Sequence, residues 1–219
     1  MPTWDVICLA NSSKHGGRCV AGLRLDGGGW VRPVSTETEG VLQPWHYTLT
    51  TGGEAALLDV LSMRLLCPRP DQHHPENWRM GHGLWDLVAR PLPPEARAVL
   101  YDALTPGPIL FGDTGDRIEY RCLERRPAKA SLALVRPDDL AWQVRDSAHS
   151  GKRQTRAVFG LGGARYSLAL TDPVWLTRLA GLPLGLHPYE GPAVLLTISL
   201  SEPFARDGFC YKLVAGVIC

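Results

Sequence analysis

The first 35 residues alternate between short apolar runs and breaks that contain glycine. The apolar runs cover residues 4–10, 18–25 and 29–34, and the breaks between them hold Gly16, Gly17 and residues 27–29. Glycine adopts the positive φ angles that tight turns require, so runs of this length joined in this way predict antiparallel strands. This pattern constrains the chain to a fold built from short hairpins.

Strand-like runs dominate the second half of the chain as well. Six of them cover residues 131–135, 140–145, 153–160, 164–170, 193–200 and 209–218. Residues 57–66 fit either a buried strand or a short helix, and this choice stays open. The proline-rich stretch at residues 68–77 predicts a loop.

Two segments carry helix signals. Residues 93–104 begin with two prolines and Glu95 and place apolar residues at helical spacing. Residues 171–181 begin with Thr171, Asp172 and Pro173 and end at Gly181. Several short strands and one helix in each half predict small antiparallel barrels or sandwiches, and not a parallel βαβ sheet. We therefore expect a mainly β protein with two short helices, divided into residues 1–115 and 116–219 at a weakly marked boundary.

Composition limits the function classes. The chain has 219 residues, 45% of them hydrophobic, and a net charge of +1, so neither disorder nor a polyelectrolyte fits. Basic residues that could bind nucleic acid would have to cluster locally, at residues 121–126 or 152–156. The six cysteines include no CxxC pair, no secretion signal precedes Trp4, and no apolar run reaches the roughly 18 residues of a membrane span. We expect a cytoplasmic protein.

The first hairpin is the leading candidate for a binding site. Its loop contains Asn11, Lys14, His15 and Arg18, and cations beside glycines are suited to phosphate. On the next strand, Trp30 could stack on a base and Arg32 could contact phosphate, as in single-strand binders. The alternative is a simple turn with solvated cations and a tryptophan in the core.

A second candidate is the segment at residues 72–79, which contains His73, His74 and Glu76. Its spacing does not match H-E-x-x-H and Pro75 interrupts any helix, so we expect no metal. Asn77 or Trp78 could contact a ligand, or the segment could form a structural Asx turn.

A third candidate is the stretch at residues 146–156. It contains Asp, Ser and His, but a triad is defined by geometry, and the phosphate-loop motif is incomplete because Arg153 follows Lys152. Lys152 and Arg153 fit an electrostatic contact with a phosphate backbone, and a solvated hairpin tip is an equal alternative. In the last strand, Lys212 is expected either at a sheet edge, where lysine prevents unwanted pairing, or pointing into a site, and the edge position is favoured.

Several blocks of the sequence together resemble a bacterial family described as a dual OB-fold-containing domain. They are residues 6–22, 29–35, 74–78, 171–173, 196–204 and 209–218. The resemblance implies two small β-barrels side by side, nucleic-acid binding and a role in bacterial defence. It implies no reaction and no catalytic residues.

The leading hypothesis is a module that binds single-stranded DNA, RNA or a nucleotide without a cofactor. The expected phosphate-binding residues are Asn11, Lys14, His15, Arg18, Arg32, Lys152 and Arg153; the stacking residues are Trp30 and Trp78; the secondary candidates are His74, Glu76 and Asn77. One alternative is a nucleic-acid- or nucleotide-processing enzyme that uses His15, His74, Glu76 or His149 as acid or base. Another is an adaptor that binds proteins, and the oligomeric state stays open.

Overall fold

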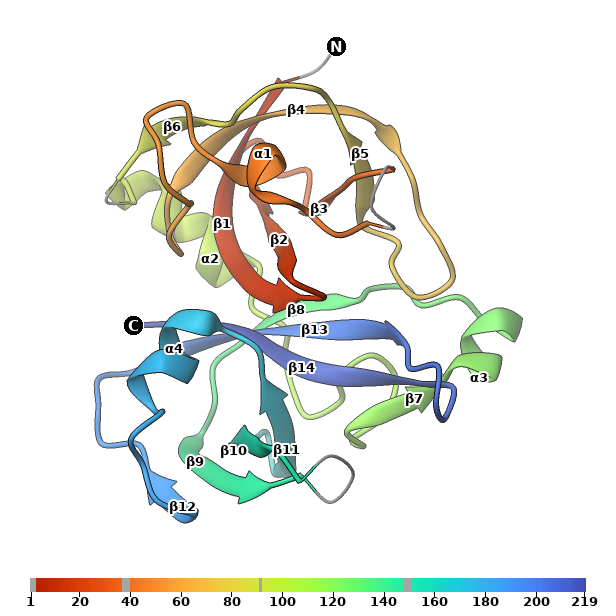
Figure 1. Cartoon of the computed structure of the whole chain (residues 1–219), viewed down its shortest axis with the longest axis vertical. Helices are drawn as coiled ribbons and strands as arrows, with labels where there is room; N and C mark the ends of the chain where they lie inside the picture. Colours follow the sequence, from red (N-terminus) through yellow and green to blue (C-terminus); the bar gives the residue numbers. More distant parts are fainter. Residues whose placement is uncertain (1–2, 37–39, 91, 148–150) are drawn as a thin grey trace.

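A computed structural model describes residues 3–36, 40–90, 92–147 and 151–219 of the chain. These residues form two β-barrels stacked one above the other (Figure 1). Within these residues, no helix has the length and apolar character needed to cross a membrane. The expected mainly β fold with two small barrels is confirmed.

The first barrel is a closed sheet of five strands, and a sixth strand extends it. The strands are β1 (Thr3–Lys14), β2 (Gly17–Arg24), β3 (Trp30–Val34), β4 (Val60–Pro68), β5 (Asn77–Met80) and β6 (Asp86–Ala89). Their order is β1-β2-β3-β5-β4, and β4 pairs with β1 to close the barrel, while β6 pairs with β4. All pairs are antiparallel except β3 with β5. This connectivity brings the β1–β2 turn, β3 and the β4–β5 loop to one end of the barrel.

The second barrel repeats this topology with its first strand broken in two. Its strands are β8 (Leu132–Val135), β9 (Asp139–Asp146), β10 (Arg153–Leu161), β11 (Ala164–Leu170), β13 (Leu195–Pro203) and β14 (Phe209–Ile218). The hydrogen-bonded strand order is β9-β10-β11-β14-β13-β8, and residues 136–138 connect its two end strands, β8 and β9, which do not pair with each other in the described part of the chain. As in the first barrel, one pair, β11 with β14, is parallel. Two short strands, β7 (Arg117–Glu119) and β12 (Gly185–Pro188), pair with β14 and β9.

Four short α-helices accompany the barrels. Both predicted helices form: residues 93–104 contain a 3-10 turn, η1 (Pro94–Ala96), followed by α2 (Arg97–Asp102), and residues 171–181 contain α4 (Pro173–Arg178). Asp172 caps α4, since its Oδ1 accepts from Val174 N at 2.9 Å. The single-turn helices α1 (Pro44–Tyr47) and α3 (Tyr120–Arg125) were not predicted.

The two barrels share a hydrophobic interface. Ile7 and Leu9 of β1 pack in one cluster with Leu134 of β8 and Ile218 of β14. A Cβ on Gly216 would lie 2.3 Å from Leu9 O, so only glycine permits this close approach of β14 to β1. All β1–β6 residues lie before position 90 and all β7–β14 residues after 116. The boundary at residue 115 stays a prediction, because the shared core joins the two parts.

Two expectations are resolved by strand pairing. Residues 57–66 contribute to strand β4, not to a helix. The expectation that Lys212 lies at a sheet edge was wrong. Its strand β14 pairs with β13 on one side and with β11 and β7 on the other, and Lys212 is 1% exposed.

Candidate functional site

A polar cavity of about 270 Å³ lies where the loops of the first barrel meet the second barrel. The β1–β2 turn supplies Lys14, β3 supplies Arg32, and the β4–β5 loop supplies Arg69 and Asp71. These segments meet because β3 runs parallel to β5, with Arg32 directly opposite Asn77. Glu202, at the end of β13, closes the cavity from the second barrel. We call this space the OB-loop cavity.

Arg32 is the most unusual group in the OB-loop cavity. The residue is 2% exposed, and its Nη2 donates to Ser199 Oγ at 3.1 Å. Its Nε and Nη1 have no hydrogen-bond partner among the described residues. A buried charge is normally paired, because removing it from water is costly. Arg32 therefore brings an incompletely hydrogen-bonded positive charge to the wall of the cavity.

The acidic groups of the cavity are already engaged. Glu202 Oε1 lies 2.6 Å from Lys14 Nζ. Asp71 Oδ1 accepts from the backbone N of His73 and of His74, at 2.9 and 2.6 Å, which fixes the β4–β5 loop. Since neither carboxylate contacts Arg32 or Arg69, the cavity retains two cations without an ion-pair partner among the described residues. Its electrostatic preference is for a negative ligand.

The two histidines of the loop are buried and neutral. Burial lowers the pKa of both below the ordinary value of 6.5, and the nearby charge of Arg32 lowers that of His74 further. His74 Nε2 donates to Leu200 O at 2.8 Å, which attaches the loop to the second barrel. The positive charge of the cavity therefore comes from its arginines and Lys14, and not from histidine.

Asp71, His73 and His74 bring their ligand atoms within 4.8 Å of one another. This is a geometry in which a metal could be held. Arg32 and Lys14 lower the pKa of both histidines electrostatically, and the same charges repel a cation. The absence of a metal site stays our prediction.

The hairpin residues divide between two faces. His15 and Gly16 form the turn, with φ angles of +44° and +82°, and Lys14 is paired with Gly17. Ser13 is paired with Arg18, so Arg18 lies on the face opposite Lys14. There Arg18 Nε donates to Glu54 Oε2 at 2.9 Å. Arg18 therefore points away from the OB-loop cavity.

Asn11 lies on the same side as Arg18. Its Nδ2 donates to Ala55 O at 3.0 Å. Asn11 and Arg18 line a separate cleft of about 770 Å³, which α4 of the second barrel also lines. The predicted hairpin site is thus distributed over two cavities.

The predicted stacking residues take part in packing. Trp30 is half-buried between the two barrels, against Leu132 and Ala215. The Trp78 ring meets Trp4 edge-on, with ring centroids 4.4 Å apart. Both rings therefore contribute to the hydrophobic interior, and their stacking role stays a prediction.

Glu76 and Asn77 organise the loop. The Glu76 carboxylate accepts from Ser131 N at 2.7 Å and Ser131 Oγ at 2.6 Å, and so anchors the loop to the residue before β8. Asn77 Nδ2 donates to Asp71 Oδ2 at 3.2 Å. Both residues shape the OB-loop cavity through contacts with protein groups.

Lys152 and Arg153 lie elsewhere. Both are exposed at the start of β10, on the side of the second barrel away from the first (Figure 1). The Arg153 guanidinium donates to Leu182 O. His149 falls outside the described residues.

Among the charged residues that line the cavity, sequence reasoning missed Arg69, Asp71 and Glu202, and it also missed Ser199, the partner of Arg32. Arg69 and Asp71 lie in the stretch that was predicted as a loop from its prolines, and an Asp within such a stretch was a usable Asx-turn signal. Ser199 and Glu202 are more than 160 positions from Arg32, and only tertiary folding brings them near.

Comparison with known proteins identifies one relationship. A family model described as a dual OB-containing domain matches residues 4–217. Neither the curated proteins nor the solved structures contain a match.

Proposed function

This chain belongs to the dual OB-containing domain family, and on that premise we propose that it binds single-stranded nucleic acid or a nucleotide, with a phosphate held in the OB-loop cavity. OB-folds commonly bind oligonucleotides with strands 2 and 3 and with the loops that join strands 1–2 and 4–5. The corresponding segments here are β2, β3, the β1–β2 turn and the β4–β5 loop. The OB-loop cavity lies at the same end of the barrel.

The observation that carries the proposal is the buried Arg32 guanidinium. Its Nε and Nη1 have no partner among the described residues, although the residue is only 2% exposed. A phosphate can accept a charge-assisted hydrogen bond from Nη1 or from Nε, but not from both at once, because these two N–H groups point away from each other in the guanidinium plane. Arg69, also without a carboxylate partner among the described residues, adds a second charge at the rim. A phosphate group fits this cavity better than a neutral or cationic ligand.

Support for an enzyme is weaker. Both Glu76 oxygens accept hydrogen bonds from Ser131, and His74 Nε2 is engaged by Leu200 O. His15 is exposed on the turn. The acid–base candidates of the described part of the chain therefore do not converge on one point, and binding without reaction is the simpler proposal.

The proposal includes a cytoplasmic location and a role in bacterial defence. All six cysteines are free, and burial raises the pKa of the Cys8 and Cys210 thiols to about 12, so both act as small apolar groups. Free thiols fit a reducing compartment. The defence role rests on the family resemblance alone.

A binding measurement tests the proposal. Fluorescence anisotropy with labelled oligothymidine, oligouridine and ATP should show binding that weakens as salt rises. Arg32→Met keeps an unbranched apolar stem and removes the guanidinium with its N–H groups, and we expect affinity to fall about a hundredfold, since a hydrogen bond to a charged group contributes ~1.5–3 kcal/mol.

Two control variants make the result specific. Arg165→Gln removes an exposed cation of the second barrel that is paired with Asp139, and it should leave affinity unchanged. Arg18→Gln removes a cation from the opposite hairpin face, and it should change affinity less than threefold, a value typical of a surface charge. If Arg32→Met bound as tightly as the unmodified protein, the proposal would be wrong.

A further inference from the structure

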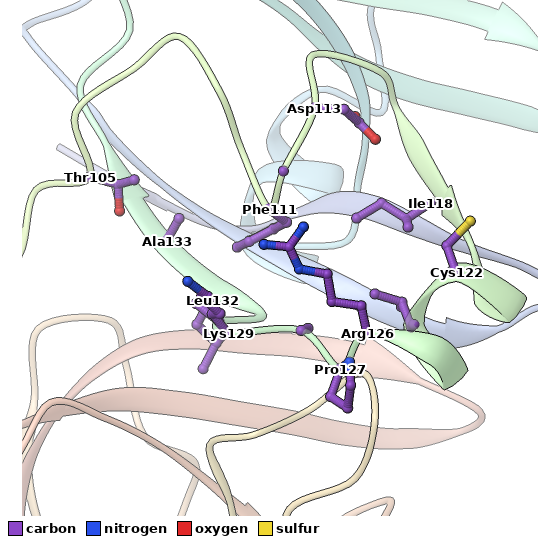
Figure 2. Close-up of a pocket in the computed structure, with 14 residues that line it drawn as sticks. Thr105, Phe111, Asp113, Ile118, Cys122, Arg126, Pro127, Lys129, Leu132 and Ala133 are labelled. Atoms are coloured by element: carbon purple, nitrogen blue, oxygen red, sulfur yellow. The ribbon is translucent and has the colours of Figure 1, made fainter.

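A second cavity, of about 550 Å³, lies between α3, the segment that follows it and the turn at Phe111 (Figure 2). Strand β8 forms one wall with Leu132 and Ala133. Its volume lies within the roughly 300–1,000 Å³ typical of small-molecule sites. We call it the α3 pocket, and it shares no lining residue with the OB-loop cavity.

The floor of the α3 pocket is apolar. Leu123, Leu132 and Ala133 are buried beneath it, and Phe111 and Ile118 complete it. Few polar groups reach this floor, so a ligand that fits it must present hydrocarbon or an aromatic ring.

The turn that presents Phe111 is held in an unusual conformation. Phe111 has a φ of +54°, which is rare for a bulky residue, and Gly112 follows with +105°. Leu110 and Asp113 pair across the turn, and the buried Lys212 Nζ binds Asp113 Oδ1 at 2.6 Å and Asp113 O at 3.0 Å. A strained residue that its surroundings hold firmly is common at binding sites. The turn therefore forms a preorganised wall.

The mouth of the pocket is positive. Figure 2 shows Arg126 pointing into the pocket on the side of Phe111, and Lys129 lies beside Leu132. Neither side chain has an ion pair or hydrogen bond with a described residue. The one carboxylate that lines the pocket, that of Asp113, is neutralised by Lys212. Two unopposed cations thus stand above an apolar floor.

We infer that the α3 pocket binds a small organic anion with an apolar body, such as an aliphatic or aromatic carboxylate or sulfonate. The apolar floor takes the hydrocarbon, and Arg126 and Lys129 bind the anionic group through charge-assisted hydrogen bonds. An inorganic anion cannot use the floor, and a hydrocarbon cation is repelled at the mouth.

Decanoate is the probe that tests the inference, with calorimetry on the full chain. We expect one saturable site for decanoate, with decyltrimethylammonium and decanol at least tenfold weaker. Arg126→Gln with Lys129→Gln should weaken decanoate binding about tenfold or more, because at least one charge-assisted contact is lost. Ala130→Leu, at a half-buried rim position, should block binding by filling the pocket.

The matched control removes the same amount of positive charge from the neighbouring helix α3. Arg121→Gln with Arg125→Gln alters exposed α3 residues that do not line the pocket, and decanoate affinity should be unchanged. Equal binding of the cationic analogue, or equal losses in the two double variants, would overturn the inference. A displacement experiment adds a further test, with the fluorescent sulfonate anilinonaphthalenesulfonate bound to the protein. If oligothymidine displaced this fluorophore and decanoate did not, the inference would be wrong, and Arg126 and Lys129 would be assigned to binding a phosphate backbone.

Discussion

The two most deeply buried cations of the described chain, one in each barrel, differ in whether a carboxylate pairs with them. Lys212 of the second barrel is 1% exposed and has a carboxylate 2.6 Å from its Nζ. Arg32 of the first barrel is 2% exposed, and among the described residues its only partner is the hydroxyl of Ser199. A buried charge that is paired serves the structure, whereas one left partly unpaired retains capacity for a ligand. The comparison distinguishes a structural cation from a binding one.

The largest expected effect concerns the paired cation. Asp113→Ala leaves Lys212 buried without its carboxylate, and we expect the free energy of unfolding to fall by about 3 kcal/mol, a value typical of breaking a buried ion pair from one side. Urea denaturation followed by fluorescence measures this change. Asp139→Asn, which breaks the exposed pair with Arg165, should cause a much smaller loss, because exposed ion pairs contribute little to stability. Similar losses in the two variants would remove the structural role assigned to Lys212.

An intermediate effect should appear on acidification. In the folded state the pKa of His73 and His74 lies below the ordinary 6.5, so below that pH the unfolded chain binds protons that the folded chain does not. The stability contributed by the neutral histidines is complete above pH 6.5 and is lost as pH falls below it, by up to about 1.4 kcal/mol per histidine per pH unit.

Denaturation curves measured across this pH range check the acid dependence. His74→Gln should flatten the dependence, whatever its effect on stability at neutral pH. Arg32→Met should also weaken it, since the charge of Arg32 lowers the pKa of His74. An unchanged slope in His74→Gln would show that this histidine is not the group that titrates.

The smallest expected effect concerns the unpaired cation. Arg32→Met removes a buried charge that lacks a carboxylate, so the free energy of unfolding should stay within about 1 kcal/mol of its original value or rise. A small change in the free energy of unfolding together with a large loss of ligand affinity would show that Arg32 serves binding and not stability. A drop of several kcal/mol on denaturation would instead make Arg32 a structural cation like Lys212.

Local signals predicted much of the fold. The glycine breaks placed the His15–Gly16 turn, and the Asp-Pro pair placed the start of α4. The four strands that were missed, β5, β6, β7 and β12, have three or four residues each and carry little apolar pattern. Such strands are held mainly by pairing with longer neighbours, so their own residues contain a weak signal.

The site was less accessible to sequence reasoning. Strand alternation could have separated Lys14 from Arg18 once the turn was placed at His15–Gly16, since Ser13 is then opposite Arg18. Nothing local could have told that Glu76 binds Ser131 or that Glu202 reaches Lys14. Those contacts depend on how the two barrels dock.

The sequence by itself determined the approximate positions of the longer strands, the turn of the first hairpin and the cap of α4, because these depend on residues close together in the chain. Only the tertiary structure decided which outward faces remain in solvent and which are buried between barrels, because that choice depends on partners more than a hundred positions away. The local sequence around Arg32 is that of an arginine on the surface of a strand. Contact with the second barrel buries its side chain and leaves two of its N–H groups without a partner among the described residues.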